Sequence, residues 1–143
     1  MADDLQLYRE RSHQDAKAMN DHARSAAQAT ILINGGAATV VIALSTKEPS
    51  IGAHVAKIMP YALGGYALGV MFGALMMFFM IHSIQRWAIV WQGRALGYPT
   101  TRIDRARRWG NIWHAVAYIC FGVAIILFLI GSAVIAGALL HSS

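Results

Sequence analysis

The chain has 143 residues, of which 57% are apolar and 13% charged, and its formal net charge is +5. Soluble domains carry about 25% charged residues, so this composition excludes an ordinary soluble enzyme and indicates an integral membrane protein. The positive charge predicts no nucleic-acid partner, because most of the excess lies in arginines that separate two apolar segments.

The charged residues are segregated into three stretches, 3–24, 47–57 and 86–108, and they leave three uncharged intervals. Each interval has about 20 residues or more, enough for a helix to cross a hydrocarbon core of about 30 Å. Lipid cannot satisfy backbone polar groups, and the intervals lack the alternating pattern of barrel strands. We therefore expect an all-α membrane protein with three transmembrane helices, at about 25–45, 58–85 and 110–140.

The first 24 residues are polar and rich in helix formers, and no Pro or Gly interrupts residues 2–34. They predict a polar N-terminal helix (1–24) that leads directly into the transmembrane domain (25–143). Asp3 and Asp4 at the start do not fit a secretory signal, so we expect the first span to remain in the mature protein.

The first span contains Asn34, Gly35 and Gly36, which would mark a turn in a soluble protein. The apolar runs on either side are too short to span separately, so one helix is expected. A mid-membrane amide should face another helix, where its hydrogen bond contributes about 0.6–2 kcal/mol. Asn34 can thus hold helices together or, alternatively, line a path for ions or solutes.

The run Ala26-Ala27-Gln28-Ala29-Thr30-Ile31-Leu32-Ile33-Asn34-Gly35-Gly36-Ala37-Ala38 resembles the first-helix segment of small proteobacterial inner-membrane proteins of no known activity. The resemblance covers about a tenth of the chain. It implies a bacterial inner, or cytoplasmic, membrane and a multi-pass protein, and it implies no activity.

A loop is expected over 46–57, and the second span is expected to begin near Ile58 with Pro60 in its first turn. Gly65, Gly69 and Gly73 then recur at every fourth position. Such a stripe clears one helix face for the close approach of another backbone. We expect a homo-oligomer or docking into a larger membrane complex; the alternative is packing of the first two spans on each other, with Asn34 opposite the glycines.

Met76 and Met80 lie four residues apart in the second span. Together with the glycine stripe and the three spans, this spacing resembles the copper-transporter family, since soft thioethers bind Cu(I). The family places its two motifs on different helices, in the opposite orientation and with further N-terminal methionines. Copper transport is therefore a minor alternative to ordinary methionine packing.

His82 and His114 lie at similar depth near the ends of two antiparallel spans. This placement is similar to the three-helix anchor subunits of respiratory dehydrogenases, and that resemblance implies haem b or quinone binding by the two histidines. The alternative is ordinary interfacial hydrogen bonding.

Residues 97–99, Gly-Tyr-Pro, predict a break, and Thr101 with Asp104 predicts a capping box that starts the third helix. Arg102, Arg105 and Arg108 share one side of its first turns. Arginines at an interface attract anionic lipid headgroups at about 1 kcal/mol each. The alternative is that they serve only to set the topology.

Lysine and arginine numbers predict the orientation: four in the N-terminal segment, two in the first loop and six in the second. The positive-inside rule places the N-terminus and the second loop in the cytoplasm and the C-terminus outside. All four tryptophans, Trp87, Trp91, Trp109 and Trp113, gather at the same interface.

The sequence contains no paired intramembrane carboxylates, no nucleophile triad pattern and no phosphate-binding glycine loop, so we expect no enzyme. The leading hypothesis is a helical membrane module that self-associates, either as an oligomeric pore, with Asn34 as a pore residue, or as a membrane-perturbing effector. The competing hypothesis is an accessory or haem- or quinone-bearing subunit of a larger membrane complex.

Overall fold

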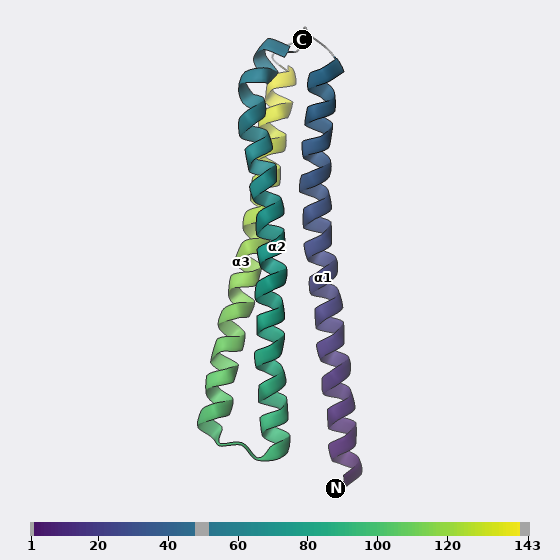
Figure 1. Ribbon diagram of the computed structural model, residues 1–143, viewed down its shortest axis with the longest axis vertical. Helices are drawn as coiled ribbons and strands as arrows, with labels where there is room; N and C mark the ends of the chain where they lie inside the picture. The colour runs from purple at the N-terminus through teal and green to yellow at the C-terminus, as the bar shows by residue number, and fades with distance from the viewer. Residues whose placement is uncertain (1, 48–51, 141–143) are drawn as a thin grey trace. The chain divides into compact units, whose positions relative to one another are not determined.

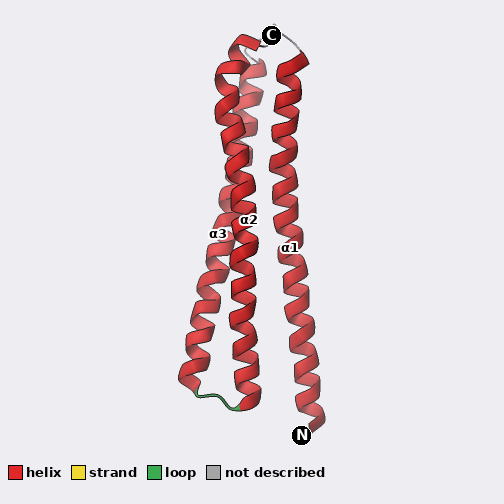
Figure 2. Cartoon of the chain, viewed as in Figure 1, coloured by secondary structure: helices red, strands yellow, loops and turns green. Residues whose placement is uncertain are grey.

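The computed structural model describes residues 2–47 and 52–140, which form three α-helices without a strand (Figures 1 and 2). They are α1 (Ala2–Lys47), α2 (Gly52–Leu96) and α3 (Thr100–Leu140). All three are long and apolar enough to cross a membrane, over Ala16–Leu44, Ala56–Leu96 and Thr100–Leu140. The predicted all-α membrane fold with three spans is confirmed.

The polar N-terminal helix leads into the first span without interruption, as expected, because α1 continues from Ala2 to Lys47. Asn34, Gly35 and Gly36 lie inside this helix and form no turn. A turn at this depth would leave backbone N–H and C=O groups without partners in lipid, whereas a helix satisfies them internally.

The connection between α1 and α2 is shorter than expected. α1 continues to Lys47 and α2 begins at Gly52, so the predicted loop over 46–57 is wrong at both ends. Pro60 consequently lies inside α2 and not in its first turn. Its missing N–H leaves the carbonyl one turn earlier without a helical partner, at an exposed position of α2. Pro49 lies outside the described residues.

The turn between α2 and α3 is a Schellman cap at the predicted break. Gly97 has φ +68°, a left-handed conformation that favours glycine, and the Tyr98 N–H donates to the Gly93 carbonyl at 2.8 Å. Arg102 N and Ile103 N then both donate to the Pro99 carbonyl, at 3.0 and 3.3 Å. Pro99 is therefore the N-cap of α3, and the predicted cap at Thr101 is wrong because Thr101 already lies within the first turn.

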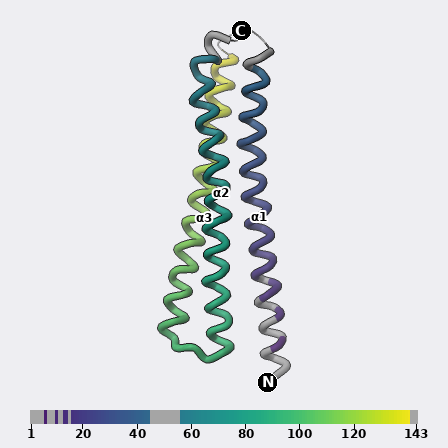
Figure 3. Tube along the Cα trace, viewed as in Figure 1, coloured from purple at the N-terminus to yellow at the C-terminus, as the bar shows by residue number. Residues whose placement is uncertain are grey.

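The three helices follow one another along the Cα trace in Figure 3. The chain divides into two compact units, each built from one segment of every helix. The arginine unit comprises residues up to Ala26 together with Met76–Tyr118, and the glycine unit comprises Ala27–Leu75 together with residues from Ile119 onward. Val41, Ala62, Tyr66 and Ile135 form the core of the glycine unit. Buried alanines recur in both units, so the helix backbones can approach closely.

Candidate functional site

Asn34 is completely buried in the glycine unit, where it faces α2 of the same chain. Its Nδ2 donates to the Thr30 carbonyl one turn earlier at 3.0 Å, and its Oδ1 has no hydrogen-bond partner among the described residues. A Cβ at Gly69 would overlap the Asn34 amide. The Gly69 Cα–H therefore points at the amide oxygen, and a weak Cα–H···O contact accounts for this acceptor.

The glycine stripe of α2 is covered within the chain. Gly69 packs against Asn34, and a Cβ at Gly73 would lie 3.2 Å from the Ile31 side chain and 3.4 Å from that of Thr30. A Cβ at Gly65 would lie 3.8 Å from the Leu127 carbonyl of α3. This arrangement corresponds to the alternative in which Asn34 lies opposite the glycines, and self-association through this stripe stays a prediction.

Gly35 and Gly36 have the opposite environment. A Cβ at either position would meet nothing within 4 Å, and Gly36 is exposed. The neighbouring Thr39 is also exposed, and its Oγ1 donates to the Gly35 carbonyl at 3.0 Å. The outward side of α1 thus presents an open notch at Gly35 and Gly36. The nearby Thr39 hydroxyl already has a hydrogen-bond acceptor.

A second polar contact in the glycine unit joins α2 to α3, and our sequence reasoning missed it. Tyr66, 2% exposed, shares a hydrogen bond of 3.2 Å with the Ser132 hydroxyl. The Tyr66 ring lies over Gly131, where a Cβ would approach within 2.9 Å of it. The Gly131-Ser132 pair in the third span is a sequence signal for this contact. The glycine leaves room for an aromatic ring, and the serine supplies a hydroxyl that can bond to the ring's own hydroxyl.

His82 and His114 both belong to the arginine unit, and each lies against aromatic rings. His82 forms a hydrogen bond through Nδ1 with the Phe78 carbonyl at 3.0 Å. Its ring centroid lies 4.3 Å from that of Phe78 and 5.9 Å from that of Trp113. His114 lies 4.9 Å from the Tyr118 ring, and its Nδ1 is buried without a hydrogen bond among the described residues. No contact between the two histidines supports haem binding, which stays a prediction.

α2 and α3 are joined in the arginine unit by a buried serine. Ser83 Oγ donates to the Gly110 carbonyl at 2.9 Å, and a Cβ at Gly110 would meet the Trp87 ring at 3.1 Å. Along the same helices, Trp109 stacks with Trp113 at 6.1 Å between ring centroids, and Trp87 lies tilted to Trp91 at 6.2 Å. The tryptophans predicted to gather at one interface thus also contact one another.

The candidate headgroup-binding arginines, Arg102, Arg105 and Arg108, are all exposed on α3. Arg102 lies over the Tyr98 ring at 4.7 Å, a cation–π contact that holds its guanidinium beside the turn. Arg94 lies in the same way over Trp91 at 5.4 Å. The exposed cations keep their attraction for anions, because neither contact neutralises charge.

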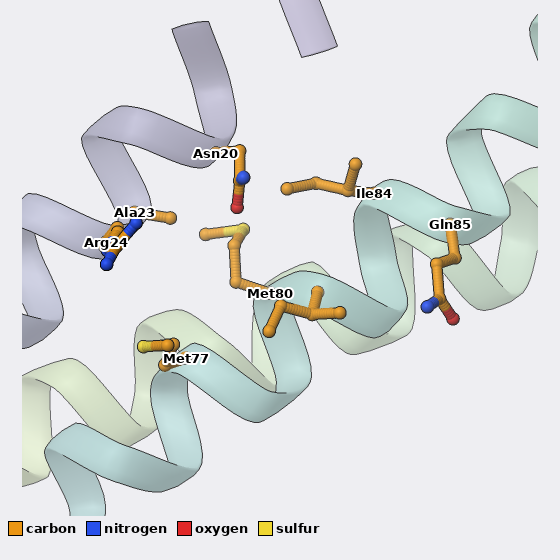
Figure 4. A pocket seen from close by; sticks show the side chains of 8 residues that line it. Asn20, Ala23, Arg24, Met77, Met80, Ile84 and Gln85 are labelled. Atoms are coloured by element: carbon orange, nitrogen blue, oxygen red, sulfur yellow. The ribbon is translucent and has the colours of Figure 1, made fainter. Parts of the chain in front are cut away.

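Met76 and Met80 are both buried in the arginine unit, at 2% and 5% exposure. Met80 lies in the floor of a groove between α1 and α2, with Asn20, Ala23 and Arg24 on the α1 side (Figure 4). The described residues contain no group of three His, Cys, Asp or Glu side chains placed to hold a metal ion. No observation favours copper over methionine packing.

Comparison with protein families, with curated proteins and with solved structures gives no match to this chain.

Proposed function

We propose that this integral membrane protein is a non-enzymatic helical module that self-associates within the bilayer through the outward face of α1. The observation that carries the proposal is the contrast between two sets of glycines. The stripe glycines of α2, Gly65, Gly69 and Gly73, are covered inside the chain, whereas a Cβ at Gly36 of α1 would meet no described residue within 4 Å.

The outward face of α1 combines this notch with two projecting apolar side chains. Leu32 is 72% exposed one turn before Gly36, and Val40 is 58% exposed one turn after it. Residues four apart lie on one helix face, so the Leu32 and Val40 side chains project on either side of the notch at Gly36. The Leu32 side chain of one copy fits the Gly36 notch of another, and the same contact repeats in reverse across a two-fold axis.

Membrane physics favours such a contact. Lipid tails are as apolar as leucine, so helices associate through close van der Waals contact and not through the hydrophobic effect. A lipid chain fills a fixed notch less completely than a matched side chain does. The Thr39 hydroxyl is already bonded to the Gly35 carbonyl, so it adds no unpaired donor to this face.

The proposal includes no conducting path. The Asn34 amide is fully buried against Gly69 of its own chain, so it can line a pore only after α1 and α2 separate. Association between copies through α1 requires no such separation and leaves the interior of each copy intact.

The experiment compares three glycine-to-leucine variants by native mass spectrometry and by thermal unfolding in detergent. We expect Gly36→Leu to abolish the oligomer without loss of thermal stability, because it fills the notch on the surface only. Gly64→Leu is the matched control, since Gly64 is exposed and open but lies on α2. Gly69→Leu should instead unfold the monomer.

Two outcomes would contradict the proposal. One is an unchanged oligomer in Gly36→Leu, and the other is a wild-type protein that is monomeric both in detergent and in lipid nanodiscs. Loss of the oligomer in Gly69→Leu without loss of monomer stability would instead indicate that copies associate through the glycine stripe of α2.

A further inference from the structure

The arginine unit contains a groove of about 350 Å³ between α1 and α2 (Figure 4). This volume is within the range of about 300–1,000 Å³ typical of small-molecule sites. Three residues of α1 and five of α2 line it: Asn20, Ala23, Arg24, Met77, Met80, Ile81, Ile84 and Gln85. It is distinct from the outward face of α1 that carries the proposed self-association.

The lining is divided by chemistry. Met80 and Ala23 are buried at 5% and 6% exposure, and the rim residues Met77 and Ile81 remain 37% and 39% exposed. These side chains form an apolar wall that is open along one side. Arg24, Asn20 and Gln85 add a cation and two amides to the same groove, and Figure 4 shows the Asn20 side chain directed toward Met80.

Arg24 has no counter-ion among the described residues. Neither an ion pair nor a hydrogen bond occupies its guanidinium among the residues that the structure describes. A guanidinium presents several N–H donors in a planar fork that matches phosphate oxygens. A cation held beside an apolar wall without a carboxylate partner is complementary to an anion that carries an apolar chain.

The depth of the groove indicates the source of that anion. Arg24 is the last charged residue before the uncharged interval of α1, and Gln85 is the last residue of the uncharged interval of α2, directly before Arg86. The groove therefore lies where each helix passes from hydrocarbon into the headgroup layer. Arginine at this level keeps its stem on apolar surface and its charge in the headgroup layer.

We propose that this groove binds one anionic phospholipid of the leaflet on the arginine-rich side. The phosphate lies on the Arg24 guanidinium with the Asn20 amide as a further donor, and one acyl chain follows Met77, Met80 and Ile81. The adjacent cation Arg86 favours an anionic lipid over a zwitterionic one and repels a cationic partner.

The experiment measures lipid adducts on the full chain by native mass spectrometry during titration with dioleoyl phosphatidylglycerol, with phosphatidylcholine and inorganic phosphate as separate arms. We expect one saturable phosphatidylglycerol site, weaker phosphatidylcholine binding and no adduct with phosphate alone. Arg24→Gln should weaken phosphatidylglycerol binding about fivefold, the effect of one cation near a lipid surface. Lys17→Gln removes the same charge from α1 outside the groove and should leave that site unchanged.

A second pair of variants tests the apolar wall without a change in charge. Ile81→Ser should weaken binding of phosphatidylglycerol, and Ile112→Ser is the matched control because Ile112 is 41% exposed on α3 and lies outside the groove. Far-UV circular dichroism verifies that each variant keeps its helices.

Equal weakening by Arg24→Gln and Lys17→Gln would overturn the proposal in favour of diffuse attraction to a basic surface. Binding of inorganic phosphate as tight as that of phosphatidylglycerol would overturn the role of the lipid chain. Both results would leave the α1 self-association intact, because the readout here is lipid occupancy and not the mass of the protein assembly.

Discussion

Single glycines carry much of the contact between helices in this protein. Gly69 receives the Asn34 amide, Gly131 receives the Tyr66 ring, and Gly110 receives the edge of Trp87. In each contact, a polar or aromatic group from another helix occupies the space that a Cβ would fill. In lipid, where no hydrophobic force drives helices together, such dispersion contacts and the hydrogen bonds beside them provide the stability.

Gly69→Ala tests the tightest of these contacts. The new methyl group overlaps the Asn34 amide, and overpacking of a filled interior costs about 1–3 kcal/mol. We expect a lower midpoint in denaturation by SDS, followed by circular dichroism. Gly64→Ala, at an open position of the same helix, should not lower it.

The double variant Asn34→Ala/Gly69→Ala identifies the cause of that loss. Removal of the amide makes room for the methyl group, so the double variant should be more stable than the sum of the two single losses predicts. Strict additivity would contradict a direct contact between residues 34 and 69.

The burial of Asn34 follows from the sequence, because an amide in the middle of an apolar helix is too costly to expose to lipid. Its partner does not follow. The choice between a helix of the same chain and a second copy depends on the rotation of α1 about its axis, and Gly35 and Gly36 beside Asn34 could have marked either contact face. The structure turns these two glycines outward and Asn34 inward.

Helix ends were predictable only where the chemistry was local. Gly97 and Pro99 mark the break before α3 through backbone conformation alone, and both lie at the turn. The start of α2 depended on a competition that the sequence does not decide, between the helix-breaking effect of Pro60 and the extension of the helix over residues 52–59. The groove between α1 and α2 was not predictable, since it depends on how two long helices pair side by side.

Gly97→Ala tests the cap at the end of α2. An L side chain in the left-handed conformation costs about 1–2 kcal/mol, so the variant should unfold at a lower SDS fraction. Gly97→Asn should lose less, because asparagine tolerates this conformation better. Equal stability of Ala and Gly at this position would show that the left-handed cap does not form.

The whole molecule was predictable in its coarse plan because charge and hydropathy are segregated along the chain. Three uncharged intervals separated by charged stretches leave a chain in a bilayer few alternatives to three spans. The predicted orientation depends on the arginines of the second loop, and the three helices alone are compatible with either orientation.

Cysteine labelling in spheroplasts tests that orientation. Cys120 is the single cysteine and is buried, so Cys120→Ala provides the background. We expect Ala56→Cys, exposed near the start of α2, to react with a membrane-impermeant maleimide in intact cells. Gln92→Cys, exposed near the arginine-rich turn, should react only after lysis. A membrane-permeant maleimide should label both, and the reverse pattern would contradict an inside N-terminus.

The glycines that are contacted by a side chain from a neighbouring helix also constrain how this sequence can change over evolutionary time. A methyl group at position 69 is incompatible with the amide at position 34, and one at position 131 is incompatible with the ring at position 66. Neither member of such a pair can drift freely while the other is retained. Among homologues we expect positions 34 and 69, and positions 66 and 131, to vary together, with a larger residue on one helix accompanied by a smaller one on its neighbour.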